Sequence, residues 1–188
     1  MKKIIYVVLV ILIFVSCENN HEKRELKKIY GEKIEFPQDM LYVENGEIKN
    51  NTFVINNDYI LLSYIDSSFC NKCHVRTFGF WKEIIDTCSL LGCNAVFIFS
   101  PKLDELEDVL SFLKSSFPYP VYVDANHEFK STNNFIPNEI EYNTFLLDNN
   151  GCIKIVGNPL YSESIWTLYK TVLYERKQYP LSSTQGHL

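Results

Sequence analysis

The chain has 188 residues, which is enough for one domain with a substantial core but not for two. Its net charge of −5 and the lack of a basic patch beside an aromatic platform argue against nucleic acid as a partner. The composition, with 13 Phe and 12 Tyr, is that of a globular protein, and the 6 cysteines are too few for a disulfide scaffold of this size. They suit an oxidising compartment that holds a few specialised thiols.

The N-terminus has the features of a bacterial lipoprotein signal. The basic pair Lys2-Lys3 precedes an apolar run over residues 4–15, which has the length of a signal-peptide core and is too short for an ordinary membrane span. The segment FVSC, residues 14–17, resembles a lipobox, in which the cysteine receives a diacylglyceryl group and becomes the new N-terminus. We therefore expect residues 1–17 to be a lipoprotein signal peptide, with a lipid at Cys17 that anchors the protein in the bacterial cell envelope. A plain secretory signal and an N-terminal anchor helix are the alternatives.

The rest of the chain divides into three parts. Residues 18–30 are polar and charged, and we expect them to form a tether between the lipid and the domain. Residues 31–177 carry the apolar patterns of one folded domain. Residues 178–188 are expected to be a flexible tail.

A hydrophobic strand and an amphipathic helix flank a pair of cysteines. The run Tyr59–Asp66 is nearly continuous in apolar residues, as a strand buried on both faces requires. The segment SSFCNKCH, residues 67–74, follows it. Apolar residues then recur at helical spacing until Gly92, which ends the predicted helix: Phe78, Trp81, Ile84, Ile85, Cys88 and Leu91. Because Cys88 lies on this apolar stripe, we interpret it as a buried core thiol.

The other predicted elements alternate between strands and helices. Strands are predicted over Leu41–Val43 and Thr52–Ile55, joined loosely through the turn signal Asn45-Gly46, and over Asn94–Ser100, Val121–Asp124, Thr144–Asp148 and Cys152–Val156. A helix is predicted after Pro101 with a buried face of Leu103, Leu106, Val109, Leu110 and Leu113, then one helical turn near Phe129 and a closing helix around Leu168. We expect Cys152 to be unpaired, and His127 lies in a loop with no visible partner. This order predicts an α/β fold in which Tyr59–Asp66 and Asn94–Ser100 are adjacent and parallel, and Thr144–Asp148 is antiparallel to them.

The spacing of Cys70 and Cys73 at a strand-to-helix junction favours dithiol chemistry. The helix start offers unpaired backbone N–H groups and the positive end of the helix dipole, which both stabilise a thiolate. Cys70 is therefore expected to be the exposed, acidic and reactive thiol, and Lys72 adds a positive charge with the same effect. Cys73 lies about one turn further on, close enough to close a disulfide or to resolve a mixed one.

Pairs of cysteines with this spacing also occur in zinc and haem sites. Structural zinc needs four ligands, but the chain has no second CxxC or histidine pair and His74 is isolated. The residues Cys70–His74 also match the CxxCH pattern of c-type haem attachment, for which His127 and His187 are the candidate axial ligands. We expect no cofactor and no metal, and zinc and haem stand as alternatives.

The order of elements, with CxxC at the first helix, resembles the thioredoxin-like fold, and most closely the TlpA-like thiol–disulfide oxidoreductases and their peroxiredoxin relatives. The matching pieces are the strand with Phe69–Cys73, the hairpin Thr144–Gly151, which is similar to the family's T-F-L-I-D-x-x-G, and Gly157–Pro159. The resemblance covers residues 32–176. It implies that Cys70 is the attacking thiol and Cys73 the resolving one.

Two residues depart from the family pattern. Phe69 stands where family members usually have Trp, and Tyr142 stands where they have a cis-proline that faces the dithiol. Because a cis bond before a residue other than proline is costly, we expect the Tyr142 peptide bond to be trans. The resemblance places a substrate groove at Phe69, Tyr142 and Asn143, and predicts that the groove differs in shape from that of the family.

Three functions follow as hypotheses. The leading one is an envelope thiol–disulfide oxidoreductase that exchanges disulfides with protein thiols and disulfides, and that contacts the membrane through its N-terminal lipid. The second is a redox-inert lipoprotein of the same fold that acts as a binding module. The third is a thiol peroxidase, because Ser67 stands 3 residues before Cys70, a partial match to the T-x-x-C arrangement of peroxiredoxins, with Arg76 as the nearest arginine.

Overall fold

The computed structural model describes residues 26–49, 53–66, 71–117 and 119–178. The predicted signal peptide with Cys17, most of the tether, the tail beyond Gln178 and the motif residues 67–70 lie outside the described residues. Phe69 and Cys70 are among the latter.

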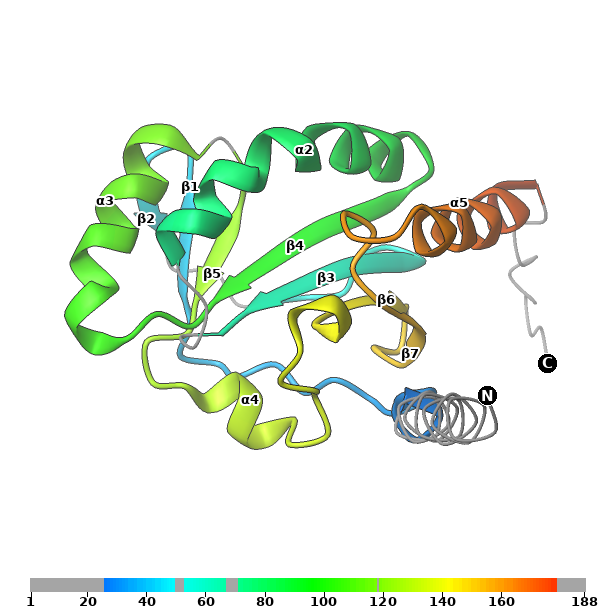
Figure 1. The fold of residues 1–188 in the computed structure, drawn as a ribbon, viewed down its shortest axis with the longest axis horizontal. Coiled ribbons are helices and arrows are strands. Elements are labelled where there is room, and N and C mark those ends of the chain that lie inside the picture. Colours follow the sequence, from blue (N-terminus) through cyan, green and yellow to red (C-terminus); the bar gives the residue numbers. More distant parts are fainter. Residues whose placement is uncertain (1–25, 50–52, 67–70, 118, 179–188) are drawn as a thin grey trace, which may run out of the picture.

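The described residues form one mixed sheet of seven strands in the order β2-β1-β5-β4-β3-β6-β7 (Figure 1). The strands are β1 (Leu41–Glu44), β2 (Glu47–Lys49), β3 (Tyr59–Ile65), β4 (Cys93–Phe99), β5 (Val121–Val123), β6 (Thr144–Asp148) and β7 (Ile153–Val156). β3 pairs in parallel with β4 on one side and antiparallel with β6 on the other. Both central strands are therefore interior, as the apolar runs and the strand–helix alternation predicted.

Helices cover both faces of the sheet. They are α2 (Asn71–Leu90), α3 (Leu106–Ser116), α4 (Glu128–Thr132) and α5 (Glu163–Gln178), with short 3-10 segments η1 (Leu103–Glu105) and η2 (Ile140–Tyr142). α2, α3 and α5 pack into one core cluster, which includes Trp81, Leu113 and Tyr169. α4 packs on the opposite face of the sheet from α2, through Phe129 (Figure 1).

The start of the described chain belongs to this second core cluster. Residues 26–29, within the segment expected to be a tether, are helical, and Ile29 is only 4% exposed. The Gly31 N–H donates to the Ile153 carbonyl at 2.9 Å. The described part of the tether therefore packs against the domain.

The first hairpin differs from the sequence-based prediction. Its turn is at Asn45-Gly46, as predicted, and both residues have positive φ, 51° and 81°, which suits a tight two-residue hairpin. The tight turn pairs Glu44 with Glu47, so the partner of β1 is Glu47–Lys49 and the predicted strand Thr52–Ile55 was wrong. No alternation of buried and exposed residues marks β2, because all three of its residues are exposed.

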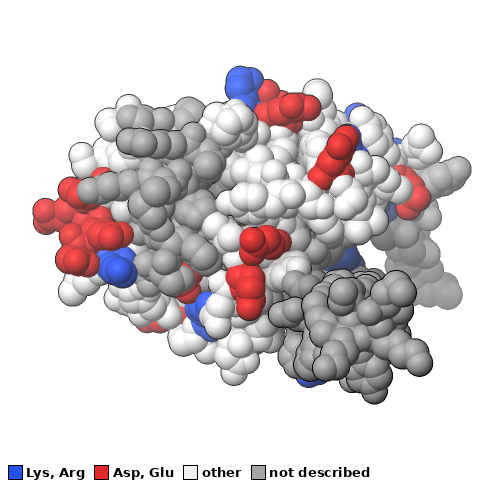
Figure 2. Space-filling view, viewed as in Figure 1, with Lys and Arg blue, Asp and Glu red and all other residues white. Residues whose placement is uncertain are grey.

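The helix after Pro101 also begins later than predicted. Leu103 lies in η1 and is 80% exposed, whereas Val109 and Leu113 of α3 are buried. The 3-10 turn changes the angular spacing of side chains, so Leu103 leaves the apolar face on which α-helical spacing would put it. Acidic residues of η1 and α3 gather at this end of the molecule (Figure 2), where they face the solvent at the start of the helix: Asp104, Glu105, Glu107 and Asp108.

The hairpin of β6 and β7 is as predicted, and Asp148 fixes its turn. One oxygen of the Asp148 carboxylate accepts hydrogen bonds from the Asn150 and Cys152 backbone N–H groups, each at 2.9 Å. The other lies 3.0 Å from the Lys154 ammonium. Cys152 is a free, half-buried thiol, as expected.

Candidate functional site

The cysteine motif lies where the central strand gives way to the first long helix. β3 ends at Ile65 and α2 begins at Asn71, the residue that follows Cys70. Cys73 is therefore in the first turn of α2, although neither its side chain nor any atom of Cys70 is among the described parts. The helix N-terminus, with its unpaired N–H groups, falls between the two cysteines, as the thiolate argument requires.

The loop before β6 lies beside this end of β3. The Tyr64 N–H donates to the Asn143 carbonyl at 2.9 Å, which extends the β3–β6 pairing one residue beyond the ladder. Next to it, the buried hydroxyls of Ser63 and Thr144 lie 3.1 Å apart. The loop is also tied to the chain that follows β7, since the Asn158 N–H donates to the Glu141 carbonyl at 2.7 Å. The described residues contain no cis peptide bond, so the Tyr142 bond is trans, as predicted.

Asn143 is the most unusual residue of this loop. Its side chain is only 3% exposed, yet neither its amide nitrogen nor its amide oxygen has a hydrogen-bond partner among the described residues. A buried polar group left without a partner costs about 1–3 kcal/mol, so native proteins rarely keep one without a reason. The sequence placed Asn143 in the substrate groove through the resemblance alone, and the structure adds this unpaired amide.

A polar cluster that the sequence analysis missed lies at the same edge of the sheet. The Ser100 N–H donates to the Ile65 carbonyl at 2.9 Å, which puts Ser100 beside the end of β3. Its hydroxyl lies 2.7 Å from His127 Nδ1 and donates to the Asp124 carbonyl at 3.2 Å. The expectation that His127 has no partner was therefore wrong. Its partner lies in a different loop, 27 residues earlier in the sequence, so the local pattern around His127 did not indicate the contact.

Two aspartates, Asp124 and Asp66, accept hydrogen bonds at this end of the sheet. Asp124, 2% exposed, accepts the N–H groups of Glu128 and Phe129 at 3.0 and 2.9 Å, and so caps α4. An aspartate between a buried strand and a short helix was the available signal for this cap. Asp66 Oδ2 accepts the Tyr64 hydroxyl at 3.3 Å and lies 3.3 Å from the Lys130 ammonium. Burial, and then the Asp66 charge, raise the pKa of Tyr64 well above its usual range, so this phenol stays protonated.

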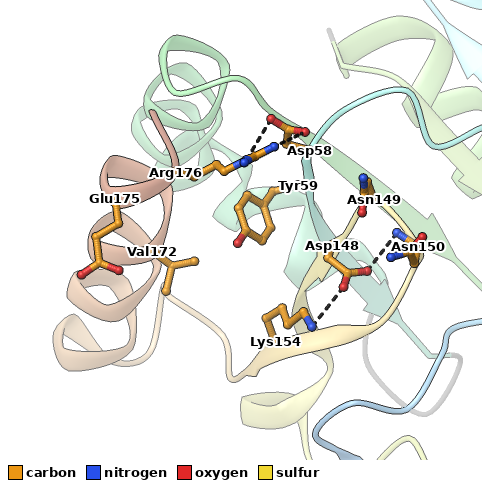
Figure 3. A pocket seen from close by; sticks show the side chains of 9 residues that line it. All are labelled: Asp58, Tyr59, Asp148, Asn149, Asn150, Lys154, Val172, Glu175 and Arg176. Carbon is orange, nitrogen blue, oxygen red and sulfur yellow. Dashed lines mark hydrogen bonds and ion pairs between the residues drawn. The ribbon is translucent and has the colours of Figure 1, made fainter. Parts of the chain in front are cut away.

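A pocket of about 470 Å³ lies at the other end of β3, between its first residue, Tyr59, and α5 (Figure 3). Four of its charged side chains form two ion pairs, Arg176 with Asp58 at 3.0 Å and Lys154 with Asp148 at 3.0 Å, and Glu175 also lines it. Since β3 spans 7 residues, this pocket is roughly 20 Å from the cysteine end of the strand. It is separate from the candidate site.

Among the residues that the structure describes, no helix has the length and apolar character needed to cross a membrane. In the same residues, no three His, Cys, Asp or Glu side chains come together as metal ligands would. The zinc and haem alternatives rest on the side chains of Cys70, Cys73 and His74, which are not described.

The sequence matches no protein-family model and no curated protein. Its structure is similar to that of an uncharacterized thioredoxin-like protein from Porphyromonas gingivalis, with a TM-score of 0.52, 17% identity, and coverage of 79% of this chain and 95% of the other. A protein from Chlorobium tepidum, provisionally assigned as thiol:disulfide interchange protein DsbE, matches with a TM-score of 0.51 and 14% identity, over 77% of this chain and 97% of the other. Enterococcus faecalis AhpC matches with a TM-score of 0.57 and 12% identity, over 80% and 95%. The chain therefore has the thioredoxin-like α/β fold that the sequence predicted.

Proposed function

We propose that this protein is a thiol–disulfide oxidoreductase of the bacterial cell envelope, with Cys70 and Cys73 as its redox pair. The observation that supports it most is the position of the motif: α2 begins at the residue after Cys70, and the strand before it, β3, ends at Ile65 and is an interior strand of a thioredoxin-like sheet. The similarity to a protein assigned as a thiol:disulfide interchange protein is in keeping with this reading.

The proposed reaction is disulfide exchange with a protein substrate. The Cys70 thiolate attacks one sulfur of the substrate disulfide, and the other substrate sulfur leaves as a thiolate that takes up a proton. The Cys73 thiolate then attacks Cys70 Sγ and releases the second substrate thiol. The substrate disulfide is reduced and the Cys70–Cys73 disulfide forms, and the same steps in reverse oxidise a substrate dithiol.

Asn143 is proposed to bind the substrate peptide beside the dithiol. A primary amide offers a donor and an acceptor, which match the carbonyl and N–H of an extended backbone. The lack of a hydrogen-bond partner for the Asn143 amide among the described residues supports this role, and because the amide is buried, the residues that cover it must move when the peptide binds. Tyr142, half-buried at the end of η2, and Phe69 complete the proposed groove.

The proposed location depends on the N-terminal segment. Lipidation of Cys17 would tether the domain to an envelope membrane, where disulfide-bonded proteins are the available substrates. Partner proteins with thiols or disulfides are therefore expected at that membrane surface.

The binding-module hypothesis keeps one specific observation in its favour, the trans peptide bond at Tyr142, because the family's cis-proline normally shapes the groove. Trapping of substrates separates the two functions. Cys73→Ala should accumulate mixed disulfides with envelope proteins on non-reducing gels, since attack still occurs but resolution does not. Cys70→Ala should capture no protein. If the protein is a binding module instead, neither Cys73→Ala nor Cys70→Ala should form mixed disulfides.

The same preparations separate the oxidoreductase from a peroxidase. The reduced wild-type protein is offered insulin or hydrogen peroxide, and the loss of its thiols is followed over time. An oxidoreductase consumes the insulin disulfides faster, whereas a peroxidase of the kind that the spacing of Ser67 and Cys70 suggested consumes the peroxide faster.

A further inference from the structure

The first half of β4 lacks a neighbouring strand on one side. β4 pairs with β3 over all 7 of its residues, but β5 pairs only with Phe97–Phe99. Asn94 is exposed, and Ala95 and Val96 are half-buried, although β4 is an interior strand. Among the described residues, the sheet therefore has a notch beside these three residues, where a longer β5 would continue.

Pro120 explains why the pairing with β5 stops. The Asp124 N–H donates to the Phe99 carbonyl at 2.8 Å, and Phe99 is paired with Val123, so the donor is the residue that follows the partner. In a parallel ladder this pattern repeats every two residues, which makes Ala95 face the notch and brings Pro120 opposite its carbonyl. Proline has no N–H and cannot donate there. No other group in the described part of the chain donates to the Ala95 carbonyl from the notch side.

A cavity of about 420 Å³ lies at the notch, and its walls suit an uncharged strand. Three aromatic rings form one wall: the ring centroid of Tyr122 lies 5.0 Å from that of Tyr42 and 5.5 Å from that of Phe53. None of the side chains that line the cavity is charged. Native proteins usually cover or charge an exposed strand edge, because it pairs readily with other strands. An extended segment without charges would cover this edge.

The C-terminal tail, residues 179–188, begins close to the notch. The Lys177 ammonium, near the end of α5, donates to the Leu90 carbonyl at 3.0 Å, so α5 ends beside the turn that leads into β4 (Figure 1). Ser89, the residue before Leu90, lines the cavity. Ten extended residues reach about 33–36 Å, whereas the edge beside residues 94–96 is about 10 Å long, so the tail has ample length.

The sequence of the tail matches the notch. It reads YPLSSTQGHL and contains no Asp, Glu, Lys or Arg, in a chain that is 22% charged. Pro180 is its one residue without an N–H, and a strand accepts proline where the nitrogen faces away from the ladder. If the nitrogen of Pro180 faces away from β4, the backbone groups of Leu181 face Ala95. In the parallel pattern of β5, residues that bond to β4 in this way have their side chains on the face that carries Tyr122.

We propose that residues 179–184 dock in the notch as a short strand parallel to β4. The Leu181 carbonyl accepts the Ala95 N–H, and the Ser183 N–H donates to the Ala95 carbonyl, which supplies the bond that Pro120 cannot make. The Leu181 side chain packs against the aromatic wall. The docked strand would complete the β4 ladder and hold the end of α5, in place of the flexible tail that the sequence predicted.

Hydrogen exchange of the full chain, resolved to single amides by mass spectrometry, tests this docking. In the parent protein, the Ala95 and Ser183 amides should be protected from exchange. Leu181→Asp removes the apolar contact and places a charge in an uncharged cavity, so the Ala95 amide should exchange at least about tenfold faster. Gln185→Asp is the matched control, because it adds the same charge to the tail beyond the docked residues and should leave the exchange of Ala95 unchanged. The Leu62 amide, in the middle of β3, should keep its exchange rate in both variants.

Three results would overturn the proposal. Exchange of Ala95 in the parent at the rate of an unprotected amide would show that the notch is open. Equal protection of Ala95 in the parent and in Leu181→Asp would show that another part of the protein covers it. Protection that appears only as the protein concentration is raised would identify a second copy of the chain as the occupant.

Discussion

Replacement of Asn143 tests whether its unpaired amide is kept for substrate binding. Leucine has nearly the same shape as asparagine and no polar atoms. Asn143→Leu should therefore remove a buried, unpaired donor and acceptor without leaving a large cavity. An orphaned buried group costs about 1–3 kcal/mol, so the variant should be more stable than the parent by about that amount. For a domain of this size, each 1 kcal/mol corresponds to about 2–4 °C in Tm.

The same substitution should slow disulfide exchange. If the amide makes two hydrogen bonds to the substrate backbone at about 0.5–1.5 kcal/mol each, their loss reduces the exchange rate by roughly 5-fold to 160-fold. The assays are thermal unfolding and the rate of insulin reduction, measured on the same preparations. A variant that is more stable and less active would fit a residue retained for function.

Asn133 provides a matched control. It is 0% exposed, but its side chain makes three hydrogen bonds: it accepts the Glu35 N–H at 2.9 Å and donates to the Glu35 and Phe129 carbonyls at 2.8 and 2.7 Å. Asn133→Leu should destabilise the protein by about 2–4 kcal/mol, because each lost bond contributes about 1 kcal/mol. If Asn143→Leu is destabilising to a similar degree and leaves insulin reduction unchanged, then the amide is structural and the reasoning is wrong.

Three further predictions concern the anchor and the fold. Cys17→Ala should release the protein from membranes or block its processing, and a variant that is processed like the parent and still stays with the membranes after high-salt washing would exclude a lipid at this residue. Burial raises the pKa of Asp148, but the hairpin N–H groups and the Lys154 ammonium lower it more, so the pKa is lowered overall. The stabilising effect of this carboxylate is therefore present above the usual aspartate pKa of about 4 and is lost as the pH falls through the lowered value. Urea unfolding across acidic pH should show this loss of stability, and Asp148→Asn should weaken its pH dependence. Gly46→Ala should destabilise by about 1–3 kcal/mol, because φ is 81° and the new Cβ would lie 2.9 Å from the Lys114 carbonyl oxygen; an unchanged denaturant midpoint would show that this turn adapts freely.

The sequence was most informative where local pattern and tertiary role coincide. β3 and the second half of β4 are buried on both faces, so their apolar runs are nearly continuous and predict an interior position directly. The turn of the β6–β7 hairpin was predictable for the same reason, since Asn149–Gly151 is a strong local signal. The position of CxxC between β3 and α2 followed from these elements.

The remaining features depend on contacts between distant residues. β2 has no apolar pattern, because all of its residues are exposed, and only the geometry of the Asn45-Gly46 turn fixes its register. Ser100 and His127 are 27 residues apart, and nothing in either local segment indicates that they meet. The unpaired amide of Asn143 is likewise a property of the folded environment. The sequence predicts that Asn143 lies in a loop, but the number of hydrogen bonds made by its side chain depends on residues that only the fold brings close to it.

The acidity of the Cys70 thiol is the most direct test of the central claim. The reduced protein is alkylated across a range of pH, and the rate at Cys70 is followed by peptide mass analysis, with Cys152 as an internal reference for a half-buried thiol. The helix start predicts a pKa of Cys70 below the free-thiol value of about 8.5, and a rate that therefore stays high at neutral pH. An ordinary pKa for Cys70, with no partner captured by Cys73→Ala, would contradict the oxidoreductase and favour the binding module.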